Sequence, residues 1–439
     1  MDVQDFIINR DQHMRPLEYD LSENFNELVR YLNDMGVLDN VPVGVNSESE
    51  IASVSDAYPA PPRAINVYGK STQDGTPTPD APVPILSVDE LALEVRGKNL
   101  LDNDGYFPTE NSIAQNAYYF EFSAVRSLIP TIQLVENVTY TCSMNVTSSA
   151  QPFSLSVGAG SGNYTRDIAT ASYLSNGRVS VTFTPTQTDL SRGNIFAFRV
   201  PRRNTPFADE CTFTISDVQL EFGSTPTTYE PYVGTTVPNL LPEGTDLRSL
   251  PDGTKDTLSL SYLRPSTRPG WAWYSREVVR RMDVLDLGTR KWTAHATKPN
   301  VFYASMAGTG GQGVAGSVDM ANVLCTALRA NKYANVMGGN TDNIINYAST
   351  TNFLYAYSSA YDTAADFKTA VSGVTLQYLL ATPVTTTLDP IELPTLPAPN
   401  ATVWCDGGSA TPTFVLEYVK DANASIAELS EAIADIVSG

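Results

Sequence analysis

The 439-residue sequence predicts an all-β fold of tandem jelly-roll-like β-sandwich modules, with a short N-terminal docking helix and a C-terminal oligomerising helix. Charged residues make up only 17% of the chain, which contains 28 Gly, 29 Pro and 22 Tyr residues. A disordered chain would have fewer aromatic residues, and a helical chain would have fewer prolines. Short segments of alternating apolar and polar residues, separated by polar turns, recur along most of the chain and favour β-sandwiches.

The first 57 residues are expected to form an attachment segment, in which a helix within 17–36 precedes an acidic linker. Ser22 can cap this helix and Gly36 can end it. One apolar stripe at helical spacing is expected to dock the helix: Phe25, Leu28, Val29, Leu32 and Met35. Because the helix cannot bury the stripe by itself, the stripe packs either on its own chain or on a partner protein.

Strand-like runs divide the rest of the chain into three β-rich parts. Residues 58–97 predict a small β segment with a Pro-rich loop, which is expected along a sheet edge because proline cannot donate to a ladder. Residues 98–232 contain about seven short alternating strands and predict a first β-sandwich. Residues 233–420 contain a second series of such runs and predict a second β-sandwich.

The last segment, residues 421–439, predicts an amphipathic helix with a heptad pattern. The a and d positions are expected to carry oligomerisation: Val419, Ile426, Leu429, Ile433 and Ile436. Isoleucine at these positions favours three or four strands over two. A helix that docks on the core of its own chain is the alternative.

The charge balance excludes two classes of partner. Lys and Arg total 28 and Asp and Glu total 48, which gives a net charge of −20. A protein that binds nucleic acid needs a basic footprint, so no nucleic-acid partner is expected. No apolar run is long enough to span a membrane, so no membrane insertion is expected.

The sequence also predicts a protein that is not an enzyme. Its two histidines, His13 and His295, show no pairing with an activated serine or cysteine. The four cysteines are too scattered for a zinc site: Cys142, Cys211, Cys325 and Cys405. Disulfides within each predicted sandwich (142–211 and 325–405) are the alternative to buried free thiols, which we predict because disulfide scaffolds are denser in cysteine.

Aromatic side chains are the candidates for ligand binding, because their faces can contact the C–H surfaces of sugars. Trp271, Trp273 and Tyr274 are close in sequence, and Trp292 is expected a hairpin away. Strand alternation places the two tryptophans of this group on one face and Tyr274 on the other. The alternative is that both tryptophans lie in the core. Three tyrosines of the first sandwich are further candidates: Tyr118, Tyr119 and Tyr164.

Three segments carry recognisable motifs: GKSTQDGTPTPDAPVPI (69–85) followed by VRGKNLLD (95–102), ISDVQLEFGSTPTTYEPY (215–232), and LQYLLATPVTTTLDPIELPTL (376–396). In this order they resemble tail proteins of bacteriophages that infect Gram-positive bacteria. The resemblance implies a tail-fibre, receptor-binding or baseplate-associated protein with carbohydrate-binding-module-like β-sandwiches. It also implies a homotrimer that contacts other tail proteins, is assembled in the host bacterial cytoplasm, and acts in the virion tail outside the host cell.

The function expected from this resemblance is non-enzymatic recognition of a host cell-surface polysaccharide or teichoic acid. A purely structural role in tail-fibre or baseplate assembly is one alternative, and a cell-surface adhesin or a glycan depolymerase is another. The apolar stripe within 17–36 would then dock the protein in the virion. No cofactor is expected except a structural Ca²⁺, which sandwiches of this type often hold and for which Asp102, Asp104 and Asp217 are candidate ligands.

Overall fold

The computed structural model describes residues 43–54, 56–101, 111–117, 119–123, 134–161, 164–191, 196–309, 323–348, 351–397 and 401–421. The predicted docking stripe and the predicted oligomerisation residues after Val419 lie outside these residues, and Val419 itself is buried at the end of a strand. Strands predominate in the described part of the chain, which confirms the all-β fold class. Its helices are short: α2 (Gln187–Leu190), the 3-10 helix η3 (Leu287–Thr289), α3 (Tyr333–Gly338) and α4 (Ala364–Ala370). None of the described helices is long and apolar enough to cross a membrane.

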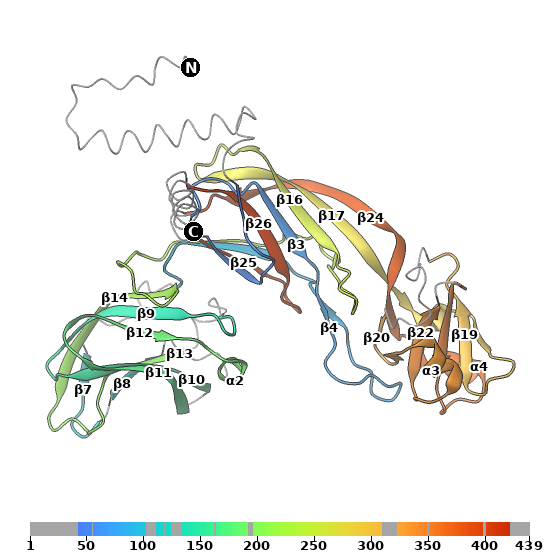
Figure 1. The fold of residues 1–439 in the computed structure, drawn as a ribbon, viewed down its shortest axis with the longest axis horizontal. Helices are drawn as coiled ribbons and strands as arrows, with labels where there is room; N and C mark the ends of the chain where they lie inside the picture. The colour runs from blue at the N-terminus through green and yellow to red at the C-terminus, as the bar shows by residue number, and fades with distance from the viewer. Residues whose placement is uncertain are drawn as a thin grey trace, which may run out of the picture.

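A central β-sandwich is built from three long stretches of the chain and one two-residue edge strand, Leu324–Cys325, from a fourth (Figure 1). In order across its larger sheet, the strands are β1 (Val43–Val45), β26 (Thr413–Val419), β3 (Ala64–Tyr68), β16 (Thr257–Pro265), β17 (Trp271–Asp286), β24 (Thr375–Pro394) and β20 (Leu324–Cys325). The second sheet contains, in order, β15 (Gly234–Val237), β6 (Ala92–Arg96), β25 (Ala401–Asp406) and β2 (Ile51–Val54). A separate two-stranded ladder joins β4 (Ser71–Thr72) and β5 (Leu86–Ser87).

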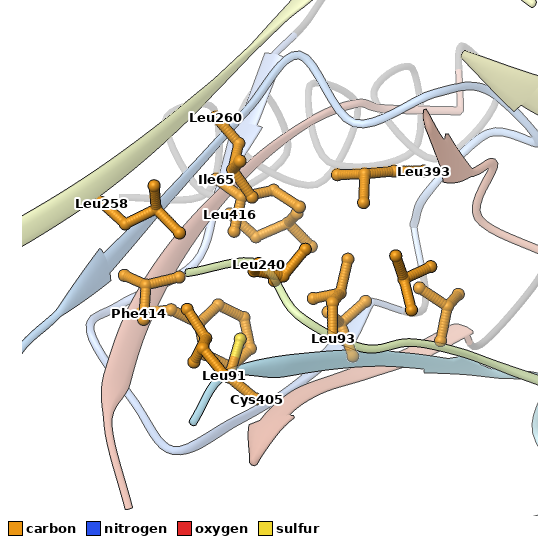
Figure 2. Packing of buried hydrophobic residues seen from close by; sticks show 14 of the residues in the cluster. Ile65, Leu91, Leu93, Leu240, Leu258, Leu260, Leu393, Cys405, Phe414 and Leu416 are labelled. Carbon is orange, nitrogen blue, oxygen red and sulfur yellow. The ribbon is translucent and has the colours of Figure 1, made fainter. Parts of the chain in front are cut away.

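Apolar side chains of both sheets meet in one buried core (Figure 2). Leu258 of β16, Leu93 of β6 and Cys405 of β25 belong to it, and each is at most 1% exposed. Residues 58–97 are therefore part of this sandwich and not a separate segment, and 233–420 is not a complete second sandwich. The expectation was wrong because alternation indicates which face of a strand is buried but not which distant strand pairs with it.

The inserted sandwich, residues 98–232, interrupts the connection between β6 and β15, which are antiparallel neighbours. Arg96 pairs with Gly234, so the chain leaves and re-enters the central sandwich at one place. One sheet contains, in order, β11 (Tyr164–Leu174), β10 (Phe153–Ser161), β13 (Phe196–Arg202) and β8 (Tyr119–Ser123). The other contains β12 (Gly177–Phe183), β9 (Tyr140–Ser148), β14 (Cys211–Phe222) and β7 (Asn111–Ile113). The module has its own apolar core.

The distal module, residues 287–374, interrupts the long hairpin of β17 and β24 in the same way, because Asp286 pairs with Thr375. Its sheet contains, in order, β18 (Trp292–Ala294), β19 (Val301–Ser305), β23 (Phe353–Tyr357), β22 (Ile344–Ala348) and β21 (Arg329–Ala330). In its core, the ring of Phe302 stacks on that of Phe367 of α4 at 4.4 Å. The two modules are thus insertions into one sandwich, and this nested arrangement replaces the predicted tandem order.

A Pro-rich strap, residues 73–85, ties the distal module to the central sandwich. Gln73 donates from Nε2 to the carbonyl of Cys325 at 2.9 Å, and the N–H of Val83 donates to the carbonyl of Thr326 at 2.7 Å. Thr326 directly follows β20, the edge strand of the larger sheet. The strap therefore follows a sheet edge, as its prolines predict.

We expect Gln73→Ala to loosen the distal module without unfolding it. The change removes the amide hydrogen bonds to the carbonyls of Cys325 and Val83, each of which contributes about 1 kcal/mol. Hydrogen-exchange mass spectrometry should show faster exchange in β20 and the first residues of β24. Gln187→Ala, at an exposed glutamine in the inserted sandwich, is the matched control. Equal exchange in the two variants would contradict a bracing role for the strap.

All four cysteines are buried and free, which confirms the predicted thiols. Cys325 belongs to the distal core and Cys405 to the central core, so the alternative pair does not share a module. Burial raises the pKa of the Cys325 thiol to about 11, and it also raises the pKa values of Cys142 and Cys405. These three thiols therefore stay protonated at neutral pH.

Candidate ligand-binding surface

The predicted tryptophan cluster does not form a single surface. Trp271 and Trp273 are half-buried on one face of β17 and Tyr274 is fully buried on the other, as alternation predicts. The guanidinium of Arg268 lies 3.7 Å from the centre of the Trp271 ring and covers that face. Tyr274 belongs to the central core, where its hydroxyl donates to the carbonyl of Pro62 at 2.5 Å. Tyr274 is therefore a core residue that a ligand does not reach.

Trp292 is also a core residue and not a neighbour of Trp271. It is 6% exposed, donates from Nε1 to the carbonyl of Leu287 at 3.0 Å, and meets the ring of Phe367 edge-on at 4.8 Å. The hairpin expectation fails because β17 runs for 16 residues and carries the chain into the distal module before Trp292.

Of the other candidates, Tyr119 begins β8 and Tyr164 begins β11. Five lie outside the described residues or have side chains outside them: Asp102, Asp104, Tyr118, Tyr119 and Tyr164. The carboxylate of Asp217 accepts a hydrogen bond from Nδ2 of Asn145 at 2.5 Å. The calcium site and the tyrosine contacts of the inserted sandwich therefore stay predictions.

A different set of aromatic side chains forms a chain of ring contacts on the distal module. We call it the aromatic platform, and it consists of His295, Tyr303, Tyr333, Phe353 and Tyr355. Tyr303 of β19 lies directly opposite Tyr355 of β23, with ring centroids 6.0 Å apart. The ring centroid of Phe353 lies 5.7 Å from that of Tyr303, and the ring centroid of Tyr333, on α3, lies 5.1 Å from that of Tyr355. His295 extends the row, edge-on to Tyr303 at 6.4 Å.

Strand alternation places the platform on the outer face of the distal sheet. In β23, Leu354 is fully buried in the distal core, so Phe353 and Tyr355 lie on the opposite face and are half-buried. In β19 the buried Phe302 likewise lies on the core face of the sheet, and the half-buried Tyr303 lies on the opposite face. The platform therefore rests on a close-packed apolar layer, which limits its movement.

Polar groups accompany the rings. Burial raises the pKa of Tyr333, and its hydrogen bond with Tyr355 raises this pKa further, so the hydroxyl stays protonated. On β22, opposite Tyr355, the fully buried Asn346 donates to the carbonyl of Asn331 at 2.8 Å. Within the described part of the chain, Oδ1 of Asn346 has no hydrogen-bond partner. Phenol groups both donate and accept hydrogen bonds, so the platform can meet hydroxyl groups as well as apolar faces.

This combination of flat rings and neutral hydroxyls suits a ligand with apolar faces and hydroxyl edges, such as a saccharide. The sequence contains a signal for it, because Phe353, Tyr355 and Tyr357 alternate within one strand. In a chain with 22 tyrosines, however, this alternation alone does not distinguish an outer face from a core face. The pairing of β19 with β23, which places Tyr303 beside Tyr355, is what identifies this row of rings as one surface.

Residues of the motif segments 95–102 and 215–232 lie at the junction between the inserted and central sandwiches. Asn99 is fully buried and donates from Nδ2 to the carbonyls of Val218 and Glu230, both at 3.2 Å. Its Oδ1 accepts the N–H groups of Leu101 and Leu220, both at 3.1 Å. Asn99 thereby joins the first and last segments of the module.

Gln219 and Glu221 extend this buried network. Oε1 of Gln219 accepts the N–H of Glu230 at 2.8 Å. The carboxylate of Glu221 accepts the N–H of Thr227 at 2.9 Å and its hydroxyl at 2.6 Å. We call Asn99, Gln219, Glu221, Thr227 and Glu230 the junction latch. The three buried residues of the latch, Asn99, Gln219 and Glu221, therefore hold the two ends of the module together.

Comparisons with known proteins give no family. No protein-family model matches the chain, and no curated protein matches it. A solved structure titled "CBM4 structure and function" is similar to 30% of this chain and 94% of its own, with 20% identity and a TM-score of 0.20. "Structure of infectious bursal disease virus Gx strain" aligns with 88% of this chain and 84% of its own, with 6% identity and a TM-score of 0.10. Both TM-scores are low, so the functional conclusion depends on the chain's own motifs and surfaces.

Proposed function

We propose that the chain is a non-enzymatic component of a bacteriophage tail that binds a glycan on the host cell surface through the aromatic platform. The three motifs described above support the tail assignment. The observation that carries glycan binding is the row of contacting rings from His295 to Tyr333 on the outer face of the distal sheet. Such a row presents several ring faces in one surface, as a chain of sugar units requires.

The five side chains of the platform offer a ligand ring faces and hydrogen-bonding groups, so the expected affinity of one copy is modest. Contact with half-buried rings removes further apolar area from water at about 25 cal/mol per Å². The homotrimer that the motif resemblance implies would present three platforms to one cell wall. Multivalent attachment of this kind raises avidity by about 10²–10⁴ over a single site. Weak individual contacts are therefore compatible with firm host attachment.

We expect the double change Tyr303→Ala and Tyr355→Ala to reduce binding to host cell walls by at least about tenfold, which corresponds to 1.4 kcal/mol. The loss follows from removing the two rings that face each other across β19 and β23. Pull-down of purified, fluorescently labelled protein with isolated cell walls measures the effect. Periodate treatment of the walls, which cleaves vicinal diols, should abolish wild-type binding.

Tyr173→Ala is the matched control for this experiment. Tyr173 is 85% exposed on the inserted sandwich, so its replacement removes an equal ring without touching the platform. Undiminished wall binding by the double variant, or binding that survives periodate, would contradict the proposal. Release of reducing sugar from the walls by the wild-type protein would indicate a depolymerase instead.

A purely structural role in tail assembly is the second candidate. Three apolar side chains of the β16–β17–β24 ribbon favour it because they are exposed: Leu263 (50%), Val284 (40%) and Val384 (42%). Exposed apolar side chains of this kind are available for contacts with other proteins. Wild-type protein that assembles into tails but binds cell walls no better than serum albumin would support this second role.

A further inference from the structure

A second surface lies at the opposite end of β17 from the distal module. The chain runs 16 residues along β17 from Trp271 to Asp286, on the order of 50 Å at about 3.3 Å per residue. Where β16 turns into β17, Arg268 lies over Trp271 at 3.7 Å and Arg264 lies over Trp273 at 5.7 Å. We call these four residues the Arg–Trp patch. It shares no residue with the aromatic platform.

The arginines of the patch are exposed. Among the residues that the structure describes, neither Arg264 nor Arg268 forms an ion pair with a carboxylate. Glu392 lies opposite Trp273 on β24, where its carboxylate accepts a hydrogen bond from the hydroxyl of Ser266 at 2.5 Å and adds one negative charge beside the two positive ones. Two unpaired guanidinium groups on neighbouring indoles are notable in a chain with a net charge of −20.

The turn that carries Arg268 is held in place by hydrogen bonds. Oγ of Ser266 accepts the N–H of Arg268 at 3.0 Å, and the N–H of Ser266 donates to the carbonyl of Trp271 at 3.0 Å. The N–H of Thr395, the residue that follows β24, donates to the carbonyl of Gly270 at 2.8 Å. With the backbone fixed and the side chain stacked, Arg268 loses little further entropy when it binds a ligand.

We propose that Arg264 and Arg268 form an anion-binding site for a polyanionic glycan that carries phosphate or carboxylate groups. A guanidinium group presents a planar fork of N–H donors that matches phosphate and carboxylate oxygens in pairs. Trp271 is a positioning residue, because Arg268 covers its face, and the half-buried Trp273 leaves an apolar edge for the C–H groups of the polymer. Two arginines are too small a footprint for nucleic acid, whose binders track many phosphates.

The test uses the full chain at about 150 mM salt, where the Debye length of about 8 Å removes long-range attraction and repulsion. The probes are poly(glycerol phosphate), polygalacturonate, neutral dextran and single-stranded DNA. Tryptophan fluorescence follows binding, because Trp271 and Trp273 lie in the patch. We expect a polyanionic glycan to bind more tightly than dextran or DNA, and the preferred polymer identifies phosphate or carboxylate as the ligand group.

The variant Arg264→Gln with Arg268→Gln should weaken this binding by about tenfold or more. Arg280→Gln with Arg281→Gln, farther along β17, is the control with the same change of charge and should bind as the wild type does. The proposal is overturned if neither polyanionic glycan binds, if dextran or DNA binds as well, or if both double variants lose binding equally. The platform variant Tyr303→Ala with Tyr355→Ala should retain polyanion binding, so failure of the proposed function and failure of this inference are distinguishable.

Discussion

Replacing Asn99 with alanine is expected to lower the free energy of unfolding of the inserted sandwich by roughly 4 kcal/mol. The change leaves two backbone carbonyls and two backbone N–H groups without their partner, and all of these contacts except the one to Glu230 are buried. Each buried polar group left unpaired costs about 1–3 kcal/mol, and local relaxation reduces the sum. Because Asn99 joins the segment that enters the module to the segment that leaves it, its loss weakens both ends together.

The four tryptophans of the chain all lie outside the inserted sandwich, which allows its stability to be followed separately. Hydrogen-exchange mass spectrometry of the Asn99→Ala protein should show lost protection in β9 and β14. Thermal melting followed by tryptophan fluorescence, which reports on the central sandwich and the distal module, should shift little. Thr214→Ala, at an exposed position of β14, is the matched control. If Asn99→Ala kept the protection of this control, the latch would not be what stabilises the module.

The sequence predicts strands well because burial in this fold alternates along them. In β16 the buried residues are Leu258 and Leu260, and the same alternation is readable in TLSLSYL. What alternation cannot predict is that Leu258 lies opposite Val67 of β3, about 190 residues earlier in the chain. Both insertions begin and end between paired strands, so the nested arrangement depends entirely on such long-range pairings.

The same limit applies to the binding surfaces. Alternation correctly separates Trp271 and Trp273 from Tyr274, but only the length of β17 shows that Trp292 belongs to another core. The platform depends on the pairing of β19 with β23, which are separated in sequence by the helix α3. The Arg–Trp patch lies within residues 264–273 on one hairpin; the sequence predicts its two tryptophans as candidates, but not that Arg264 and Arg268 lie over their rings.

The other large effect is expected at Asp256, a fully buried carboxylate beside the long hairpin. The pairing of β16 with β17 ends at Thr257 and Val279, and the side chain of Asp256 takes over as the next acceptor. Its Oδ1 accepts the N–H groups of Arg281 at 2.5 Å and Met282 at 3.2 Å, and its Oδ2 accepts the N–H of Arg248 at 2.9 Å. Just beyond this point β17 continues toward the distal module (Figure 1).

Asp256→Ala leaves these three N–H donors without an acceptor and is expected to lower the free energy of unfolding by roughly 4 kcal/mol. Urea denaturation followed by tryptophan fluorescence measures it, because Trp271 and Trp273 lie on the same strand β17. Asp252→Ala, at an exposed aspartate of the preceding turn, is the control and should cost less than about 1 kcal/mol. Equal urea midpoints for the two variants would contradict a stabilising role for the buried carboxylate.

The pH dependence gives an independent check on Asp256. Burial raises its pKa above the ordinary value of 3.8, although the N–H donors act in the opposite direction. Between the unfolded and folded pKa values the folded chain binds more protons, so the contribution of Asp256 to stability decreases as the pH rises through that window. Asp256→Asn has no titrating group at this position. The free energy of unfolding of the wild type, relative to that of Asp256→Asn, should therefore be greatest below about pH 4 and decrease above it. If this difference in stability grew as the pH rises, the N–H donors would outweigh burial in setting the pKa.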